Sequence, residues 1–251
     1  MTRIYTKPGE EQPKLNKESV LSFFEERAKK VKVLGPTRAV IYQDKSVGLA
    51  ERRDVAEKKL LLPLLELTPQ SCVLDAGCGT GRWAETIIPE CASYVGVDVS
   101  PGLVAVAAER FKNAVNAQFS VCAVDSISPQ HKGLERTFTH ILSFGVFIYL
   151  NDDEITKALK GYASVSAPGT RIMLREPIAV KERLTLLEHF SDDMEQQYSA
   201  IYRTEAELFS LFELAFSDEH FSLRGEGDVY PDAALNNRTE TKQKWFLWEK
   251  S

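Results

Sequence analysis

Apolar positions near the N-terminus of the chain recur at helical spacing. The first 16 residues are rich in Lys, Glu, Pro and Gln, which is typical of a loose arm. The helix expected next places Val20 and Phe23 on one face and charged residues on the other. The same pattern predicts a second helix over residues 49–65. We therefore expect residues 1–66 to form an arm and lid helices beside a separate core.

From residue 72 onward, short apolar runs alternate with helical stretches. The runs are 72–74, 94–97, 119–121, 141–144 and 171–174. The helical stretches between and after them are 82–88, 103–111 and 152–164. This alternation predicts βαβ units and a mainly parallel sheet with helices on both faces.

The C-terminal third follows a different pattern. Residues 178–203 are rich in charge and aromatic side chains and show no strand pattern, so we expect a helical cap there. A helix over 204–216 and two closing strands, near 220–223 and 245–248, complete the predicted elements. Residues 67–251 are thus expected to form an α/β core with the cap inserted at about 178–203.

Composition narrows the class of protein. The chain has 251 residues, of which 43% are apolar and 27% charged, as in an ordinary globular protein. With 31 Lys and Arg against 36 Asp and Glu, its net charge of −5 provides no general attraction for nucleic acid. No apolar stretch is long enough for a membrane helix, and the polar N-terminus lacks the pattern of a signal peptide. The cysteines form no CxxC pair, so we expect a cytoplasmic protein without a structural metal.

A glycine cluster follows the apolar run 72–74. Gly77, Gly79 and Gly81 permit a tight turn, and the N-terminus of the next helix offers N–H groups to a ligand. The next run ends at Asp98, whose carboxylate can accept hydrogen bonds from two vicinal ribose hydroxyls. Together these features predict a ribose-containing ligand at the edge of an α/β sheet.

The residues around the glycines distinguish between possible ligands. A dinucleotide fingerprint requires a glycine where this chain has Arg82. Asp75 places a negative charge near the ligand, which disfavours a pyrophosphate and suits a cationic amino or sulfonium group. The run Asp75-Ala76-Gly77-Cys78-Gly79-Thr80-Gly81, followed by Val97-Asp98-Val99-Ser100, resembles the signature of class I S-adenosylmethionine-dependent methyltransferases. The resemblance covers about residues 72–177.

The resemblance implies a Rossmann-like sheet of seven strands, mainly parallel, with the last strand antiparallel. It also implies that the glycine loop holds the methionine part of S-adenosyl-L-methionine, with S-adenosyl-L-homocysteine as the product. Asp98 would hold the ribose, Val99 would pack on the adenine, and Asp125 would read its amino group or simply cap a helix. Tyr42 would either close over the donor or pack in the core. The residues expected at the donor site are Tyr42, Asp75, Gly77, Cys78, Gly79, Gly81, Asp98, Val99, Asp125, Ser126, Ser143, Phe144 and Gly145.

The acceptor side is less clearly marked. A hydroxyl acceptor benefits from a general base, whereas a neutral amine needs little more than alignment. Glu176 and His189 are the candidate bases, although Glu176 is equally suited to pairing with Arg175, and His189 to a solvated surface position. Arg175 and Arg238 are candidates for binding an anionic acceptor, because guanidinium matches carboxylate and phosphate in geometry.

The segments that flank the core resemble those of bacterial methyltransferases in saccharide or secondary-metabolite pathways. We therefore expect an O-methyltransferase acting on a small molecule, as a monomer or homodimer without nucleic-acid or membrane partners. Three alternatives remain: an N-methyltransferase of a small amine or sugar amine, a nucleic-acid methyltransferase, and a non-catalytic protein that binds S-adenosylmethionine. The nucleic-acid alternative is disfavoured by residues 143–146 at the end of the fourth apolar run. They read Ser-Phe-Gly-Val, whereas amino-methylating base modifiers have an Asn/Asp-Pro-Pro-aromatic tetrad there.

Overall fold

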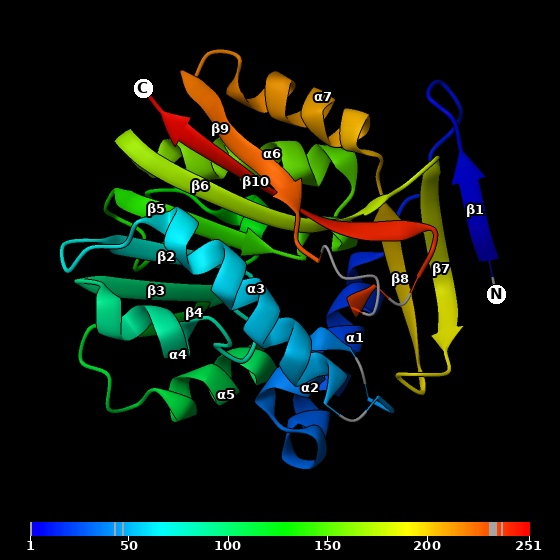
Figure 1. Ribbon diagram of the computed structural model, residues 1–251, viewed down its shortest axis with the longest axis horizontal. Helices are drawn as coiled ribbons and strands as arrows, with labels where there is room; N and C mark the ends of the chain where they lie inside the picture. Colours follow the sequence, from blue (N-terminus) through cyan, green and yellow to red (C-terminus); the bar gives the residue numbers. More distant parts are fainter. Residues whose placement is uncertain (1, 43, 47, 231–234, 237) are drawn as a thin grey trace.

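A seven-stranded sheet forms the centre of the molecule (Figure 1). The computed structural model describes residues 2–42, 44–46, 48–230, 235–236 and 238–251. In spatial order the strands are β4 (Ala117–Val121), β3 (Ser93–Asp98), β2 (Cys72–Ala76), β5 (Phe138–Phe144), β6 (Ser166–Ala179), β10 (Thr241–Lys250) and β9 (Phe221–Asp228). The first five are parallel, and β10 is antiparallel to both of its neighbours. The expected fold, with its last strand reversed, is confirmed.

Helices cover both faces of this sheet because alternate strand residues point to opposite sides. Leu74 and Ile141 face the cluster that contains residues of α6 (Asp152–Ser164) and α7 (Glu205–Phe216). Val73 and Leu142 face the opposite cluster, with residues of α3 (Leu49–Leu65) and α4 (Ala84–Ile87). The remaining core helices are α5 (Pro101–Arg110) and the short turns η1 (Ile88–Glu90), η2 (Val124–Ser126) and η3 (Phe147–Tyr149).

The predicted helical cap over residues 178–203 is wrong. This segment contains the end of β6 and two further strands, β7 (Arg183–Ser191) and β8 (Gln196–Tyr202). They form a second, antiparallel sheet with β1 (Thr2–Thr6), in the order β1-β7-β8. The expected loose arm is therefore also wrong for residues 2–6. The pairing joins segments about 180 positions apart, as in Ile4 opposite Thr185, so neither strand is recognisable from its own sequence.

The second sheet and the N-terminal helices form a roof over the carboxyl ends of the central strands (Figure 1). This roof consists of β1, β7, β8, α1 (Lys17–Leu34) and α2 (Pro36–Ile41). Fully buried Arg27 of α1 makes a two-pronged ion pair with Asp44, with both distances at 2.7 Å. Lys30 Nζ donates to the backbone oxygen of Met194 in the turn between β7 and β8, at 2.6 Å. The expected helices of the N-terminal part are confirmed, and within the described residues no helix is long and apolar enough to cross a membrane.

Candidate donor and acceptor site

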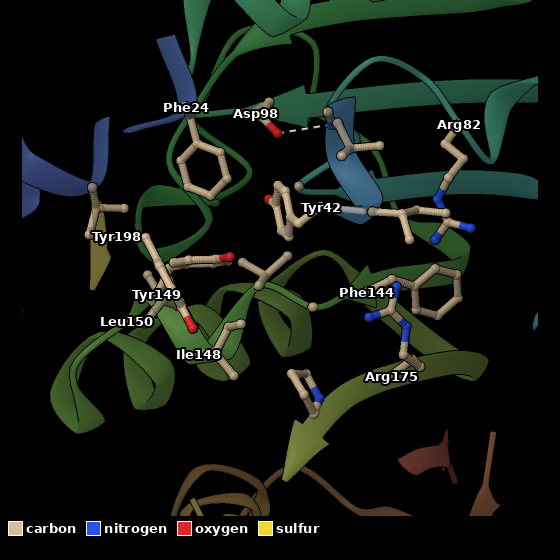
Figure 2. A pocket seen from close by; sticks show the side chains of 18 of the residues that line it. Phe24, Tyr42, Arg82, Asp98, Phe144, Ile148, Tyr149, Leu150, Arg175 and Tyr198 are labelled. Carbon is tan, nitrogen blue, oxygen red and sulfur yellow. Dashed lines mark hydrogen bonds between the residues drawn. The ribbon is translucent and has the colours of Figure 1, made fainter. Parts of the chain in front are cut away.

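A cavity of about 300 Å³ lies between the carboxyl ends of the central strands and the roof (Figure 2). One end is formed by the glycine loop after β2 and by Asp98 at the end of β3. Aromatic side chains of the roof also line the cavity, among them Phe24 and Tyr198. The cavity thus joins two compartments that the sequence predicted separately.

The glycine loop makes the turn that the motif predicted. Gly77 has a φ of 88°, and a Cβ placed on it would lie 2.4 Å from Cγ2 of Val146, so a side chain does not fit there. The N–H groups of Gly77 and Cys78 both donate to the backbone oxygen of Val97, at 2.8 and 2.9 Å. These bonds hold the loop against the end of β3 and leave its backbone facing the cavity.

Asp98 connects the glycine loop with the next turn. Its Oδ2 accepts the N–H of Gly79 at 2.9 Å, and its Oδ1 accepts the N–H of Ser100 at 2.9 Å. Burial raises the pKa of Asp98 to about 6, and the two backbone N–H groups oppose that rise. Each carboxylate oxygen retains capacity to accept a further hydrogen bond at the cavity edge.

Asp75 is a second buried carboxylate at the cavity. It is 3% exposed and accepts a hydrogen bond from the hydroxyl of Tyr94. Burial raises its pKa to about 6, while the Tyr94 hydrogen bond and Arg82 oppose the rise. Such a group is stabilised in its ionised form when a cation binds next to it.

The remaining donor-side residues surround these carboxylates. Val99, Phe144 and Gly145 line the cavity, as does Asp125, which accepts a hydrogen bond from Lys17 Nζ at 2.9 Å. Lys17 also pairs with Glu154 at 2.6 Å, so the first residue of α1 joins the roof to the core beside the cavity.

A buried ion-pair network at the other side of the loop was not predicted. Glu57 of α3 is 1% exposed and accepts from Arg82 at 2.8 Å and from Arg175 at 3.1 Å. Arg82 also pairs with Asp54 at 2.7 Å. Burial opposes ionisation of Glu57, but the two arginines outweigh it and lower its pKa to about 2. The side chain of Arg82, at the position where a dinucleotide fingerprint has glycine, thus ties α3 to the glycine loop.

Aromatic side chains enclose the acceptor end of the cavity (Figure 2). The ring of Tyr149 lies 4.9 Å from that of Phe24 and 6.5 Å from that of Tyr42. Burial raises the pKa of Tyr42 to about 12, so its hydroxyl stays protonated at neutral pH. Arg238 lines the same end and donates to the hydroxyl of Tyr202 at 3.0 Å. Within the described residues no carboxylate forms an ion pair with Arg238.

Several predicted site residues do not line the cavity. Gly81 packs against Phe111 instead, and buried Ser143 accepts a hydrogen bond from Tyr162 at 3.2 Å. Ser126 is exposed beside Asp125. The other predicted donor-site residues lie at the cavity: Tyr42, Asp75, Gly77, Cys78, Gly79, Asp98, Val99, Asp125, Phe144 and Gly145.

Neither predicted base lies at the cavity. Glu176 is 1% exposed and its Oε1 accepts the N–H groups of Val146 and Phe147, at 2.9 and 3.0 Å. His189 of β7 is half-buried against Tyr198, and burial lowers its pKa. A general base must reach the acceptor directly or through one water, so these positions do not support the expected roles. Among the described residues, no three or more His, Cys, Asp or Glu side chains are grouped to hold a metal ion.

Comparison with known proteins agrees with the geometry. Residues 73–169 match the family described as "Methyltransferase domain". A demethylmenaquinone methyltransferase of Tropheryma whipplei (strain Twist) is 28% identical over 138 residues, which are 55% of each chain. A phosphoethanolamine N-methyltransferase 1 of Triticum aestivum is 22% identical over 210 residues, covering 80% of this chain and 39% of the relative. The matches thus span about half or less of these curated relatives.

Solved structures share the fold over nearly the whole chain. Haemonchus contortus phosphoethanolamine N-methyltransferase 1, in complex with phosphoethanolamine and S-adenosylhomocysteine, aligns with a TM-score of 0.69 and 16% identity, covering 94% of this chain and 50% of that one. The complex of DhpI with SAH aligns with a TM-score of 0.63 and 17% identity, covering 93% and 96%. The strand order and the glycine loop with Asp98 agree with the Rossmann-like fold that the sequence resemblance implied. Residues 73–169 therefore match a methyltransferase domain, and the chain shares its fold with a methyltransferase solved with S-adenosylhomocysteine.

Proposed function

We propose that this enzyme transfers a methyl group from S-adenosylmethionine to a small molecule held in the aromatic end of the cavity. The observation that carries the proposal is that one cavity connects Asp98 and the glycine loop with Tyr149, on the loop after β5, and with Tyr198 of the roof. S-adenosylmethionine supplies a methyl group already activated by its sulfonium. The protein therefore has to align the acceptor and exclude water.

The residues at the donor end fit this cofactor. Asp98 would accept the ribose hydroxyls, and the negative charge of Asp75 would favour the cationic amino-acid end. Val99, which is 37% exposed at the cavity, offers an apolar surface for the adenine. Because Gly77 carries no side chain, the cofactor would be able to approach the backbone of the loop closely.

The acceptor end favours an amine over a hydroxyl. No histidine among the described residues lines the cavity, and Glu176 lies behind its wall. A neutral amine attacks without a strong base, and aromatic rings stabilise the methylammonium product through cation–π contacts. This ordering reverses the expectation from sequence, which placed O-methylation first because of the resemblance of the flanking segments. The Triticum aestivum and Haemonchus contortus proteins, which are named as N-methyltransferases, support it.

O-methylation of a small hydroxyl compound, such as a saccharide, is the second candidate. It is favoured by Asp193, a half-buried carboxylate that lines the cavity from the turn between β7 and β8. Its Oδ2 has no hydrogen-bond partner among the described residues, so it is the carboxylate of the roof best suited to accept a proton from a hydroxyl.

The experiment is incubation of the enzyme with methyl-labelled S-adenosylmethionine and two acceptor mixtures, one of small amines and one of saccharides. S-adenosylhomocysteine release and labelled products are followed by mass spectrometry. We expect labelled products from the amine mixture with wild type and with Asp193→Asn. Products from the saccharide mixture alone, lost in Asp193→Asn, would establish the second candidate. Donor binding without release of S-adenosylhomocysteine in any mixture, including a cell-extract metabolite pool, would contradict transferase activity.

A further inference from the structure

The loop of residues 145–150, which follows β5, forms a wall common to both ends of the cavity. At the donor end it packs on the glycine loop, where Cγ2 of Val146 lies 2.4 Å from the position of a Cβ on Gly77. At the acceptor end it carries Tyr149, whose ring lies 4.9 Å from that of Phe24 (Figure 2). A shift of this loop therefore changes both compartments at once.

Two buried charged side chains hold the backbone of this loop from behind. Glu176 Oε1 accepts the N–H groups of Val146 and Phe147, at 2.9 and 3.0 Å. Arg203 donates to the backbone oxygens of Phe147 and Leu150, at 2.8 and 2.6 Å. Glu176 is 1% and Arg203 2% exposed, and neither lines the cavity. Both act on the cavity only through the backbone of the loop.

Arg203 also connects the loop to the roof. It directly follows β8, and its Nε donates to Asp152 Oδ1 at 2.7 Å. Arg183 of β7 donates to both oxygens of Asp152, at 3.0 and 2.9 Å. The second sheet, the start of α6 and the loop are therefore held by one set of ion pairs.

We propose that Glu176 and Arg203 are positioning residues that keep the 145–150 loop in the shape required for methyl transfer, and that Glu176 must be ionised to do so. The proposal rests on the proposed function, because the loop borders the same donor and acceptor compartments. A carboxylate accepts two N–H groups more strongly than a neutral acid does. Protonation of Glu176 therefore loosens the loop at Val146 and Phe147.

The surroundings of Glu176 place this protonation near neutral pH. Burial raises the pKa of Glu176 to about 7, and the N–H groups of Phe147 and Val146 oppose the rise. Its Oε2 has no hydrogen-bond partner among the described residues. The charged and titratable groups that face it are Arg175 on β6, Arg203 after β8, Tyr162 on α6 and its strand neighbour Lys244 on β10.

Lys244 does not neutralise Glu176 directly. Its ammonium pairs with Glu205 and, at 3.4 Å, with Glu226. Of the facing groups, Arg175 and Arg203 favour the ionised carboxylate but are themselves engaged by other carboxylates. The ionised carboxylate of Glu176 is thus stabilised by the loop that it positions together with Arg175 and Arg203.

The test follows the backbone amides of Val146 and Phe147 by nuclear magnetic resonance, in protein labelled with ¹⁵N-valine and ¹⁵N-phenylalanine. We expect both amide shifts to titrate together with a midpoint near pH 7 in wild type. Glu176→Gln keeps the size and an acceptor oxygen but cannot ionise, so both shifts should stay constant across the same range. Glu135→Gln is the matched control, because Glu135 accepts the N–H of Gly133 at 2.8 Å on the exposed surface. It should leave the titration unchanged.

Two results would overturn the proposal: constant shifts in wild type, or the same titration in Glu176→Gln. The wild-type titration alone is decisive if the variant does not fold. A second measurement tests the effect on the site: at pH 8, Glu176→Ala should weaken S-adenosylhomocysteine binding at least fivefold, and Glu135→Gln should not. The titration is recorded with and without S-adenosylhomocysteine. If the protein does not bind that compound, the proposed function fails, whereas the titration of the unliganded protein still judges the role of Glu176.

Discussion

The carboxylate of Asp98 and the backbone N–H of Gly79 are joined by a hydrogen bond of 2.9 Å. This bond spans the crevice between the ends of two adjacent parallel strands, β2 and β3. It fixes the glycine loop relative to the group expected to hold the ribose. The donor end is therefore already organised in this structure, which reduces the ordering cost of binding.

Asp98→Ala should weaken binding of S-adenosylhomocysteine by about 1.5–3 kcal/mol, because hydrogen bonds to a charged group are lost. This corresponds to roughly a tenfold to 150-fold higher dissociation constant, measurable by calorimetry. Asp153→Ala removes an exposed carboxylate of α6 and should leave binding unchanged. Equal affinity of wild type and Asp98→Ala for S-adenosylhomocysteine would show that Asp98 does not bind the donor.

Donor affinity should also depend on pH. Burial raises the pKa of Asp98 and of Asp75 to about 6, so both carboxylates take up protons as the pH falls below that value. Ribose hydroxyls and a cationic amino group bind the ionised forms better. Affinity for S-adenosylhomocysteine should therefore increase from pH 5 to 7, and the further increase above pH 7 belongs to ionisation of Glu176. Calorimetry across this range should show a shallower increase in Asp98→Asn, which retains only the contribution of Asp75; an identical profile would contradict the assignment.

Gly77→Ala should reduce affinity for S-adenosylhomocysteine more than Gly169→Ala does. Gly77 has a φ of 88° and Gly169 a φ of 86°, so alanine strains the backbone similarly at both positions, by about 1–2 kcal/mol. A Cβ on Gly77 meets Val146 at 2.4 Å, whereas a Cβ on Gly169 meets nothing within 4 Å. Both variants should lose stability in thermal unfolding, but S-adenosylhomocysteine binding should fall only in Gly77→Ala. A similar loss in Gly169→Ala would point to a general folding defect.

The gathering of Asp75, the glycine loop and Asp98 at one end of the cavity could be predicted from the sequence because their signals are local. Asp75 and Asp98 each directly follow or end an apolar run, and parallel strands bring such ends to one edge. Glu57 was missed because its partners Arg82 and Arg175 come from distant segments that only the fold brings together.

The wrong expectation that Glu176 lies at the cavity has a simpler cause. Arg175 and Glu176 are neighbours in β6, and successive residues of a strand point to opposite faces. Arg175 lines the cavity, so Glu176 lies behind it. The strands β1 and β7 of the roof could not be predicted because their pairing bridges most of the chain, and in the described part of the chain β8 pairs only with β7. Their apolar residues pack on α1, and this long-range packing overrides the local impression of a helix.

Arg238→Gln should weaken acceptor binding if the acceptor carries an anionic group. Arg238 donates to Tyr202 at the acceptor end and forms no ion pair with a carboxylate among the described residues, so its charge is available to a phosphate or carboxylate. With an anionic amine from the acceptor mixture, KM should rise about 10-fold, in line with loss of about 1.5 kcal/mol from a charged hydrogen bond. S-adenosylhomocysteine affinity should be unchanged, and Arg224→Gln, on the exposed edge strand β9, serves as the control. An unchanged KM would show that Arg238 does not bind the acceptor.

Glu57→Gln should destabilise the protein by about 3–5 kcal/mol, because it leaves Arg82 and Arg175 without their shared buried carboxylate. The loss should depend on pH in a defined direction. Burial opposes ionisation of Glu57, but Arg175 and Arg82 lower its pKa from 4.5 to about 2. A carboxyl group with a lowered folded-state pKa stabilises the protein fully above its unfolded pKa, and this stabilisation declines as the pH falls toward the folded value. The difference in unfolding free energy between wild type and Glu57→Gln should therefore be constant from about pH 5 to 7 and shrink between about 4.5 and 2. Denaturant unfolding at several pH values measures this difference, and a difference that grew on acidification would show that Glu57 is not held ionised by the two arginines.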